Sequence, residues 1–140
     1  MTVSERSPVV AGLFSEDAAG ARLLGSRCAA CGTPYFPRSD RCHHPDCTDS
    51  QMEDAAFGPL GTVWSYSVQN YPPPPPALYE EPYRPYALAV VDLEDGIRVV
   101  GRLTDDAGDV RVGAPVELVL APLRQEDDGC ALITWMFRLR

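Results

Sequence analysis

Four cysteines in two close pairs constrain this chain more than any other feature of its sequence. Cys28 and Cys31 form the first pair, and Cys42 and Cys47 form the second, all within twenty residues. This spacing is typical of a structural zinc site, because each pair can occupy a tight turn that directs two thiolates at one ion. Gly32 supplies the permissive backbone that such a turn commonly needs. The sequence therefore predicts a zinc ribbon over residues 26–56.

Other arrangements of these cysteines remain open at this point. The thiols could form two disulfides or lie free in a core, but Met1–Pro8 contains Glu5 and Arg6 and no apolar run. Nothing there predicts a secretory signal, so we expect a cytoplasmic protein with reduced thiols. His43 or His44 could instead replace one cysteine as a zinc ligand, since both lie in the second turn.

Composition limits the partners of the chain. Of its 140 residues 45% are hydrophobic, and no apolar run approaches the roughly 20 residues of a membrane span. The formal net charge is −8, and all 12 basic residues are arginine. Because nucleic-acid binding depends on a basic footprint, this charge disfavours a nucleic-acid partner. The fifth cysteine, Cys130, is expected to be a small buried apolar residue.

The segment before the first cysteine predicts a loose arm followed by one short helix, within residues 1–25. Ser15 is a candidate N-cap, with Glu16 and Asp17 in the first turn, where the helix dipole favours acids. Gly25 is placed to end the helix. After the cysteines, the polar and acidic segment Thr48–Ala56 is expected to be a linker. Between the two pairs, Tyr35 and Phe36 are expected to pack over the metal site.

From Gly61 the apolar pattern changes to a period of two, which predicts strands. In the first strand Trp64, Tyr66 and Val68 alternate with polar residues and are expected on one side. Asp95-Gly96 predicts a hairpin between the second and third strands. The remaining strands are expected over Ala87–Leu93, Ile97–Leu103, residues 116–120 and residues 133–139. The expected fold is mainly β, with a short N-terminal helix and a zinc ribbon before a five-stranded OB-type barrel at residues 57–140; a small open sandwich is the alternative.

The long loop after the first strand contains five consecutive prolines. Consecutive prolines favour the extended polyproline geometry, so the loop could be only a stiff surface connection. A stiff arm that carries exposed aromatics could also dock on a partner at low entropic cost, and long loops in small domains tend to be functional. The candidate interface residues are Tyr71, Pro72, Pro73, Pro74, Tyr79 and Tyr83.

No group of residues in the sequence predicts independent catalysis. The two histidines both lie in the second cysteine turn, and no Ser/His/Asp order, phosphate loop or dinucleotide fingerprint is present. A zinc ion with four protein ligands has no open position for water, so the predicted site is structural. We therefore name no catalytic residue in this chain.

The order of several weak motifs resembles a known family. It is the family of small proteins that join a rubredoxin-like zinc ribbon to an OB fold and accompany thiolase-like enzymes. The resemblance extends from about Phe14 to Leu139, although four residues separate the second cysteine pair where the family commonly has two. The motifs are Cys28-Ala29-Ala30-Cys31-Gly32, Phe36-Pro37-Arg38, the second cysteine pair, Gly61-Thr62-Val63, Pro85-Tyr86-Ala87, Asp95-Gly96-Ile97-Arg98 and Val112-Gly113.

The resemblance implies an accessory subunit that binds acyl-CoA, while a thiolase, acyltransferase or thiolase-like aldolase partner supplies the catalytic residues. The branch it resembles most pairs with an aldolase that cleaves the side chain of a steroid acyl-CoA, as a two-plus-two heterotetramer. It thus implies a required but non-catalytic subunit of a lyase or acyltransferase complex. Other hypotheses are a nucleic-acid-binding OB module and a zinc structural adaptor without a small ligand.

In this context the third strand gains a candidate role. Alternation places Arg98 and Arg102 on one face, where with Arg84 or Arg111 they could hold the phosphates of CoA. The alternative is a solvated face that balances nearby acids such as Asp92 and Glu94.

Overall fold

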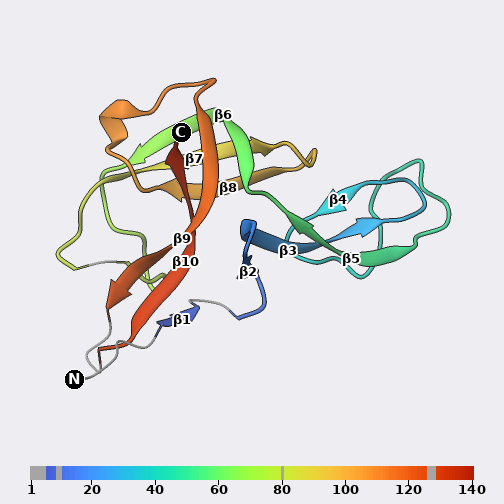
Figure 1. Cartoon of the computed structure of the whole chain (residues 1–140), viewed down its shortest axis with the longest axis horizontal. Helices are drawn as coiled ribbons and strands as arrows, with labels where there is room; N and C mark the ends of the chain where they lie inside the picture. Colours follow the sequence, from blue (N-terminus) through green and yellow to red (C-terminus); the bar gives the residue numbers. More distant parts are fainter. Residues whose placement is uncertain (1–5, 9–10, 80, 126–128) are drawn as a thin grey trace.

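Strands form nearly all the regular structure in the computed structural model, which describes residues 6–8, 11–79, 81–125 and 129–140 (Figure 1). They form a six-stranded sheet with the order β1-β10-β8-β7-β6-β9 and a four-stranded sheet in which β2, β4 and β5 surround β3. The elements are β1 (Arg6–Pro8), β2 (Phe14–Asp17), β3 (Gly20–Cys28), β4 (Pro34–Tyr35), β5 (Met52–Phe57), β6 (Leu60–Gln69), β7 (Tyr86–Leu93), β8 (Arg98–Leu103), the 3-10 helix η1 (Ala107–Asp109), β9 (Pro115–Gln125) and β10 (Ala131–Leu139).

Strands β6 to β10 close into a barrel, which confirms the predicted five-stranded architecture. β6, β7 and β8 form an antiparallel meander, and β8 continues to β10 through a short parallel pairing. β9 pairs with β10 along its length and returns to β6 at Leu60–Thr62, which closes the barrel. The core is mostly aliphatic and includes Val63, Val91, Leu103 and Leu118, each no more than 2% exposed. Two aromatic rings, Phe57 and Phe137, are buried in the same cluster.

The predicted N-terminal helix is wrong, because this segment forms the β2–β3 hairpin. The Asp17 carboxylate accepts a hydrogen bond from the Ala19 backbone at 2.8 Å, and Gly20 has a φ of +118°, so the chain turns where the helix was expected to continue. From Gly20 to Gly25 burial alternates from residue to residue, with Ala21 and Leu23 inward. The apolar residues therefore follow a period of two, and pairing with β2 and β5 on either side of β3 outweighs their weak helical pattern.

The predicted linker over Thr48–Ala56 is also wrong in its second half. Met52–Phe57 forms β5, which pairs antiparallel with β3 from Leu23↔Phe57 to Cys28↔Met52. The acidic residues Glu53 and Asp54 lie on this strand and are exposed. Charges on an exposed edge strand are common in natural sheets, because they discourage pairing with other chains.

A bulge in β6 separates the three residues that were predicted to share one face. The register between β6 and β7 shifts between Val63 and Ser65, which leaves Trp64 as the extra residue. Beyond this bulge Tyr66 and Val68 pair with Ala89 and Ala87, which are fully buried, so they lie on the inward side of the sheet. A bulge of one residue reverses the faces of all later side chains, and simple alternation could not reveal it.

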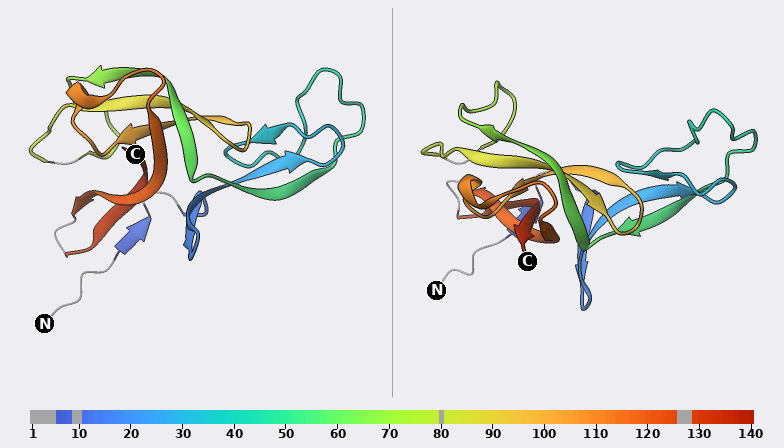
Figure 2. Two further views of the ribbon diagram at one scale, coloured as in Figure 1. Left: turned by 45° about the horizontal axis from the view of Figure 1, so that its top comes forward. Right: turned by 90° about the horizontal axis from the view of Figure 1, so that it is seen from above.

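The ribbon sheet extends from one side of the barrel, and the loop between β6 and β7 projects from the opposite end (Figures 1 and 2). Two kinds of contact fix the ribbon to the barrel. Asp95, at the β7–β8 turn, accepts hydrogen bonds from Arg27 Nη2 at 3.1 Å and from the Gly58 backbone at 2.6 Å. Trp135 of β10 packs against the rings of Phe14 and Phe36, at 6.4 and 5.4 Å between centroids.

No helix in the described part of the chain is long and apolar enough to span a membrane.

Replacing Gly25 by alanine is expected to destabilise the protein. A Cβ at Gly25 would lie 2.1 Å from the Tyr35 carbonyl oxygen and 2.8 Å from the Phe57 ring, so β3 and β4 would have to separate. We expect a loss of at least about 2 kcal/mol of unfolding free energy, as for other overpacked sites. Gly108→Ala is the matched control, because nothing lies within 4 Å of its Cβ. Equal unfolding midpoints for the two variants in urea would contradict this packing.

Candidate functional site

The four cysteines are presented by two loops of the ribbon. Cys28 ends β3 and is fully buried, and the turn to Cys31 closes with a hydrogen bond from the Gly32 backbone to the Cys28 carbonyl at 2.6 Å. In the second loop, the Cys42 backbone donates to Ser50 Oγ at 2.8 Å. The Cys47 backbone donates to the His44 carbonyl at 3.1 Å. Local hydrogen bonds thus shape both loops around the thiols.

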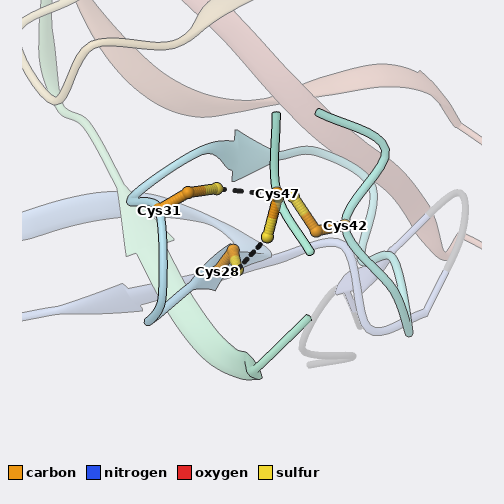
Figure 3. Close-up of side chains that lie close together, drawn as sticks. All are labelled: Cys28, Cys31, Cys42 and Cys47. Atoms are coloured by element: carbon orange, nitrogen blue, oxygen red, sulfur yellow. Dashed lines mark hydrogen bonds between the residues drawn. The ribbon is translucent and has the colours of Figure 1, made fainter. Parts of the chain in front are cut away.

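The structure brings all four thiols together (Figure 3). Their sulfur atoms lie within 4.8 Å of one another, with 3.8 Å between Cys28 and Cys47 and 3.5 Å between Cys31 and Cys42. A tetrahedron with metal–sulfur distances of about 2.3 Å requires about 3.8 Å between sulfurs, so the donor set fits a zinc ion. All four positions would be filled by sulfur, which assigns zinc a structural role.

Neither histidine belongs to this group of ligand atoms. His43 Nε2 lies 3.3 Å from Ser39 Oγ, and its ring packs edge-on against Tyr35. His44 Nδ1 accepts a hydrogen bond from the Asp46 backbone at 3.2 Å. Both side chains are therefore engaged within the second loop.

Hydrogen bonds around the sulfurs favour thiolates at two of the positions. Backbone N–H groups of Gln51, Cys31 and Ala30 lower the pKa of Cys28 to about 6. The hydroxyl of Tyr35, 3.3 Å from Cys42 Sγ, lowers the pKa of that thiol. The Asp49 backbone acts in the same direction on Cys47, but burial and the other three thiols raise its pKa to about 12. Four thiols this close hold all their negative charge only with a cation among them, which zinc supplies.

The two aromatic residues expected over the metal site have different roles. Tyr35 lies beside the thiols, where its hydroxyl also accepts a hydrogen bond from the His43 backbone at 2.7 Å. Phe36 packs instead on Trp135 at the barrel. The fifth cysteine, Cys130, is half-buried rather than buried.

A second candidate site is a groove on the barrel with a volume of about 350 Å³. It lies over β7 and β8, where the Pro-rich loop contributes Leu78 and β10 contributes Trp135. Trp135 Nε1 donates to the Val100 carbonyl at 2.9 Å, which fixes the indole at one wall. The lining is mostly apolar with one charged residue, Arg102: Leu78, Tyr86, Leu88, Val100, Gly101, Arg102, Leu123, Thr134 and Trp135.

The three arginines predicted to bind CoA have different surroundings. Arg102 lines the groove, and its guanidinium lies 4.2 Å from the centre of the Tyr86 ring. Arg98 does not line the groove. It stacks on Trp64 at 3.8 Å and binds Asp92 through two hydrogen bonds of 2.7 and 3.1 Å, which lower the pKa of Asp92. Arg84 is exposed near the end of the Pro-rich loop.

The predicted interface residues on the Pro-rich loop also separate into two groups. Tyr79, Tyr83 and Tyr86 form a chain of edge-on ring contacts at 5.8 and 6.2 Å, and the Tyr83 hydroxyl donates to the Gln69 carbonyl at 2.6 Å. These rings hold the loop against the barrel. Tyr71, by contrast, is 84% exposed beside Pro72, and Pro73 and Pro74 follow it. Sequence reasoning missed Leu78 and Trp135 as groove residues, because no local pattern brings them together.

We expect one zinc per chain, bound by Cys28, Cys31, Cys42 and Cys47. Cys31→Ser removes one thiolate and should abolish stoichiometric zinc and lower the unfolding temperature, because a ribbon of this size depends on its metal. Cys130→Ser is the matched control and should retain zinc, since Cys130 lies outside the cluster. Metal analysis by mass spectrometry measures the zinc content of both variants, and thermal unfolding measures their stability. A full zinc equivalent in the Cys31→Ser protein would show that this thiol is not a ligand.

Known proteins resemble this chain over both of its parts. Residues 17–53 match the family described as "ChsH2, rubredoxin-like zinc ribbon domain", and residues 55–121 match "ChsH2, C-terminal OB-fold domain". A "DUF35 domain-containing scaffold protein" of Methanocaldococcus jannaschii is 34% identical over 121 residues, which cover 84% of this chain and 80% of that protein. The benzoylsuccinyl-CoA thiolase subunit BbsA of Thauera aromatica is 29% identical over 117 residues, covering 83% and 75%.

A solved structure shares the fold. A chain of the Ltp2-ChsH2(DUF35) aldolase has a TM-score of 0.63 and 30% sequence identity, and the match covers 84% of each chain. The resemblance seen in the sequence motifs is thereby confirmed at the level of the family. The chain belongs to the ChsH2-like DUF35 family, whose members join a rubredoxin-like zinc ribbon to an OB-fold domain.

Proposed function

We propose that this protein is an accessory subunit of a thiolase-like complex, in which it binds a CoA thioester and its partner carries the catalytic residues. The reaction that we favour is the retro-aldol cleavage of an acyl-CoA, with a steroid side chain as the acyl group. The observation that carries the proposal is the likeness, over 84% of the chain, to a chain of the Ltp2-ChsH2(DUF35) aldolase. The similarity to a thiolase subunit, BbsA, supports the same class of partner.

The chemistry of the metal centre agrees with a non-catalytic role. A zinc ion with four thiolate ligands has no position for a water or a substrate oxygen, so it can neither activate a nucleophile nor polarise a carbonyl. The two histidines of the chain hydrogen-bond within the second ribbon loop, away from the groove residues. In our proposal the zinc ribbon therefore shapes the subunit, and the groove on the barrel meets the substrate.

The groove suits the two chemical parts of an acyl-CoA. Its apolar lining can cover the pantetheine arm or the acyl group, while Arg102 can attract the phosphates. We assign Arg84 a supporting role, because it is exposed close to Tyr86 at the same end of the Pro-rich loop. Arg98 contributes less in this proposal, since Asp92 already neutralises its charge through two hydrogen bonds.

The same proposal gives the composition and location of the complex. Thiolase-like enzymes that are symmetric dimers offer two equivalent surfaces, so we expect two copies of this subunit and two of its partner. Because free cysteines persist in reducing compartments, we expect the complex in the cytoplasm.

We expect no turnover from this chain alone and acyl-CoA cleavage only when both subunits are present. The reason is that the catalytic residues belong to the partner in this proposal, whereas part of the CoA site belongs to this chain. The test is to purify a tagged copy from its native host, identify the thiolase-like protein recovered with it, and assay each subunit alone and both together. Full cleavage activity of the partner alone would refute the accessory role.

Arg102→Ala should weaken the affinity of the assembled complex for the CoA thioester by about tenfold, because a charge-assisted contact contributes about 1.5–3 kcal/mol. Zinc content should not change. Arg41→Ala is the matched control, since it removes the same charge from an exposed position in the ribbon. Calorimetric titration of each complex with the thioester measures the effect. Equal affinities for the two variants would remove Arg102 from the CoA site.

A further inference from the structure

The second half of β6 has an edge without a strand partner. β6 pairs with β7 along Gly61–Gln69 but with β9 only at Leu60–Thr62. On the β9 side, backbone hydrogen bonds end at Val63, which contacts Gly113 and Ala114. Within the described ranges, no other strand pairs with β6. In an antiparallel ladder alternate residues direct their N–H and C=O groups to opposite edges, so alternate groups between Trp64 and Gln69 face away from β7.

The side chains along this edge are exposed and apolar. Trp64, Tyr66 and Val68 are 52%, 39% and 40% exposed, and Tyr71 follows at 84%. An exposed edge of this composition is a template for pairing with another chain. The bulge at Trp64 lies where the open segment begins, so it does not interrupt the residues that follow.

The charge pattern distinguishes this edge from the other open edges. β2 carries Glu16 and Asp17, β5 carries Glu53 and Asp54, and the end of β9 beyond its pairing with β6 carries Arg124, whereas no charged residue occurs between Asp54 and Glu80. Charged residues on an edge prevent association with other strands. Charge protects these edges, and the two-residue edge strand β4 contains a proline, whereas the edge of β6 has neither from Trp64 to Gln69, although 23% of the residues in the chain are charged.

We propose that the edge of β6 from Trp64 to Gln69 binds an extended, uncharged strand of the thiolase-like partner, which adds to the barrel sheet beside β6. This inference rests on the proposed function and names the surface by which the partner binds. Unpaired backbone groups recognise another backbone in extended form, and the exposed side chains supply the apolar contact. Pairing with a second copy is disfavoured, because each copy carries a net charge of −8.

Hydrogen–deuterium exchange tests the proposal without any substitution. The probe is the complex recovered from the native host through a tagged copy of this chain, compared with the chain alone. We expect amides between Trp64 and Gln69 that exchange freely in the isolated chain to exchange at least about tenfold more slowly in the complex. The β2–β3 turn, residues 16–19, is exposed and does not pair with β6, so it serves as an internal reference and should not change. Unaltered exchange at residues 64–69 in an intact complex would overturn the proposal while leaving the proposed function in place.

Two matched substitutions give an independent test. Val68→Lys places a charge on the proposed edge and should weaken the affinity for the partner by about tenfold or more. Ala18→Lys is the control, because Ala18 is exposed in the β2–β3 turn, which does not pair with β6. Both variants should keep their zinc and remain folded, because Val68 is 40% exposed and the ammonium group of a lysine there can reach solvent. Equal partner affinity for the two variants overturns the proposal. The proposal is also overturned if amides 64–69 of the isolated chain become protected from exchange as its concentration rises, because the edge would then pair with a second copy. Failure to recover any thiolase-like partner overturns the proposed function as well.

Discussion

The structure depends on one strand that belongs to both of its parts. Near the start of β3, Ala21 and Leu23 lie in the apolar core that this strand shares with the barrel. The strand ends at Cys28, the buried thiol of the metal cluster. Because the first half of β3 packs in this core, the orientation of the ribbon depends on packing in the barrel, together with the contacts of Asp95 and Trp135. Truncating a buried leucine such as Leu23 typically costs about 2–5 kcal/mol, so this connection is a large part of the stability of a small domain.

Aromatic contacts between the ribbon and the barrel also join the metal site to the proposed groove. Trp135 packs on Phe36 of the ribbon and also forms one wall of the groove, where its indole binds the Val100 carbonyl. The ribbon thus supports a residue of the groove directly. Rigid packing of this kind lets the ribbon, and with it the metal that we expect there, hold Trp135 in place at the groove.

Sequence reasoning succeeded where the determining contacts are local. The cysteine pairs, the Asp95-Gly96 turn and the alternation in β7 are each encoded within a few residues, and the order of these motifs indicated the family. It failed where distant pairing decides the outcome. The segment before Cys28 is a strand because β2 and β5 pair with β3, and the faces of Tyr66 and Val68 follow from a bulge at Trp64. The groove could not be predicted either, since Leu78 and Trp135 meet only in the closed barrel.

We propose that this chain is a zinc-containing accessory subunit that acts with a thiolase-like enzyme. Native mass spectrometry of the assembly that a tagged copy recovers from its host tests this claim most directly, because it reports subunits and metal together. We expect a species with two copies of this chain, two thiolase-like subunits and two zinc ions. Recovery of the chain alone, with nucleic acid, or without zinc would contradict it.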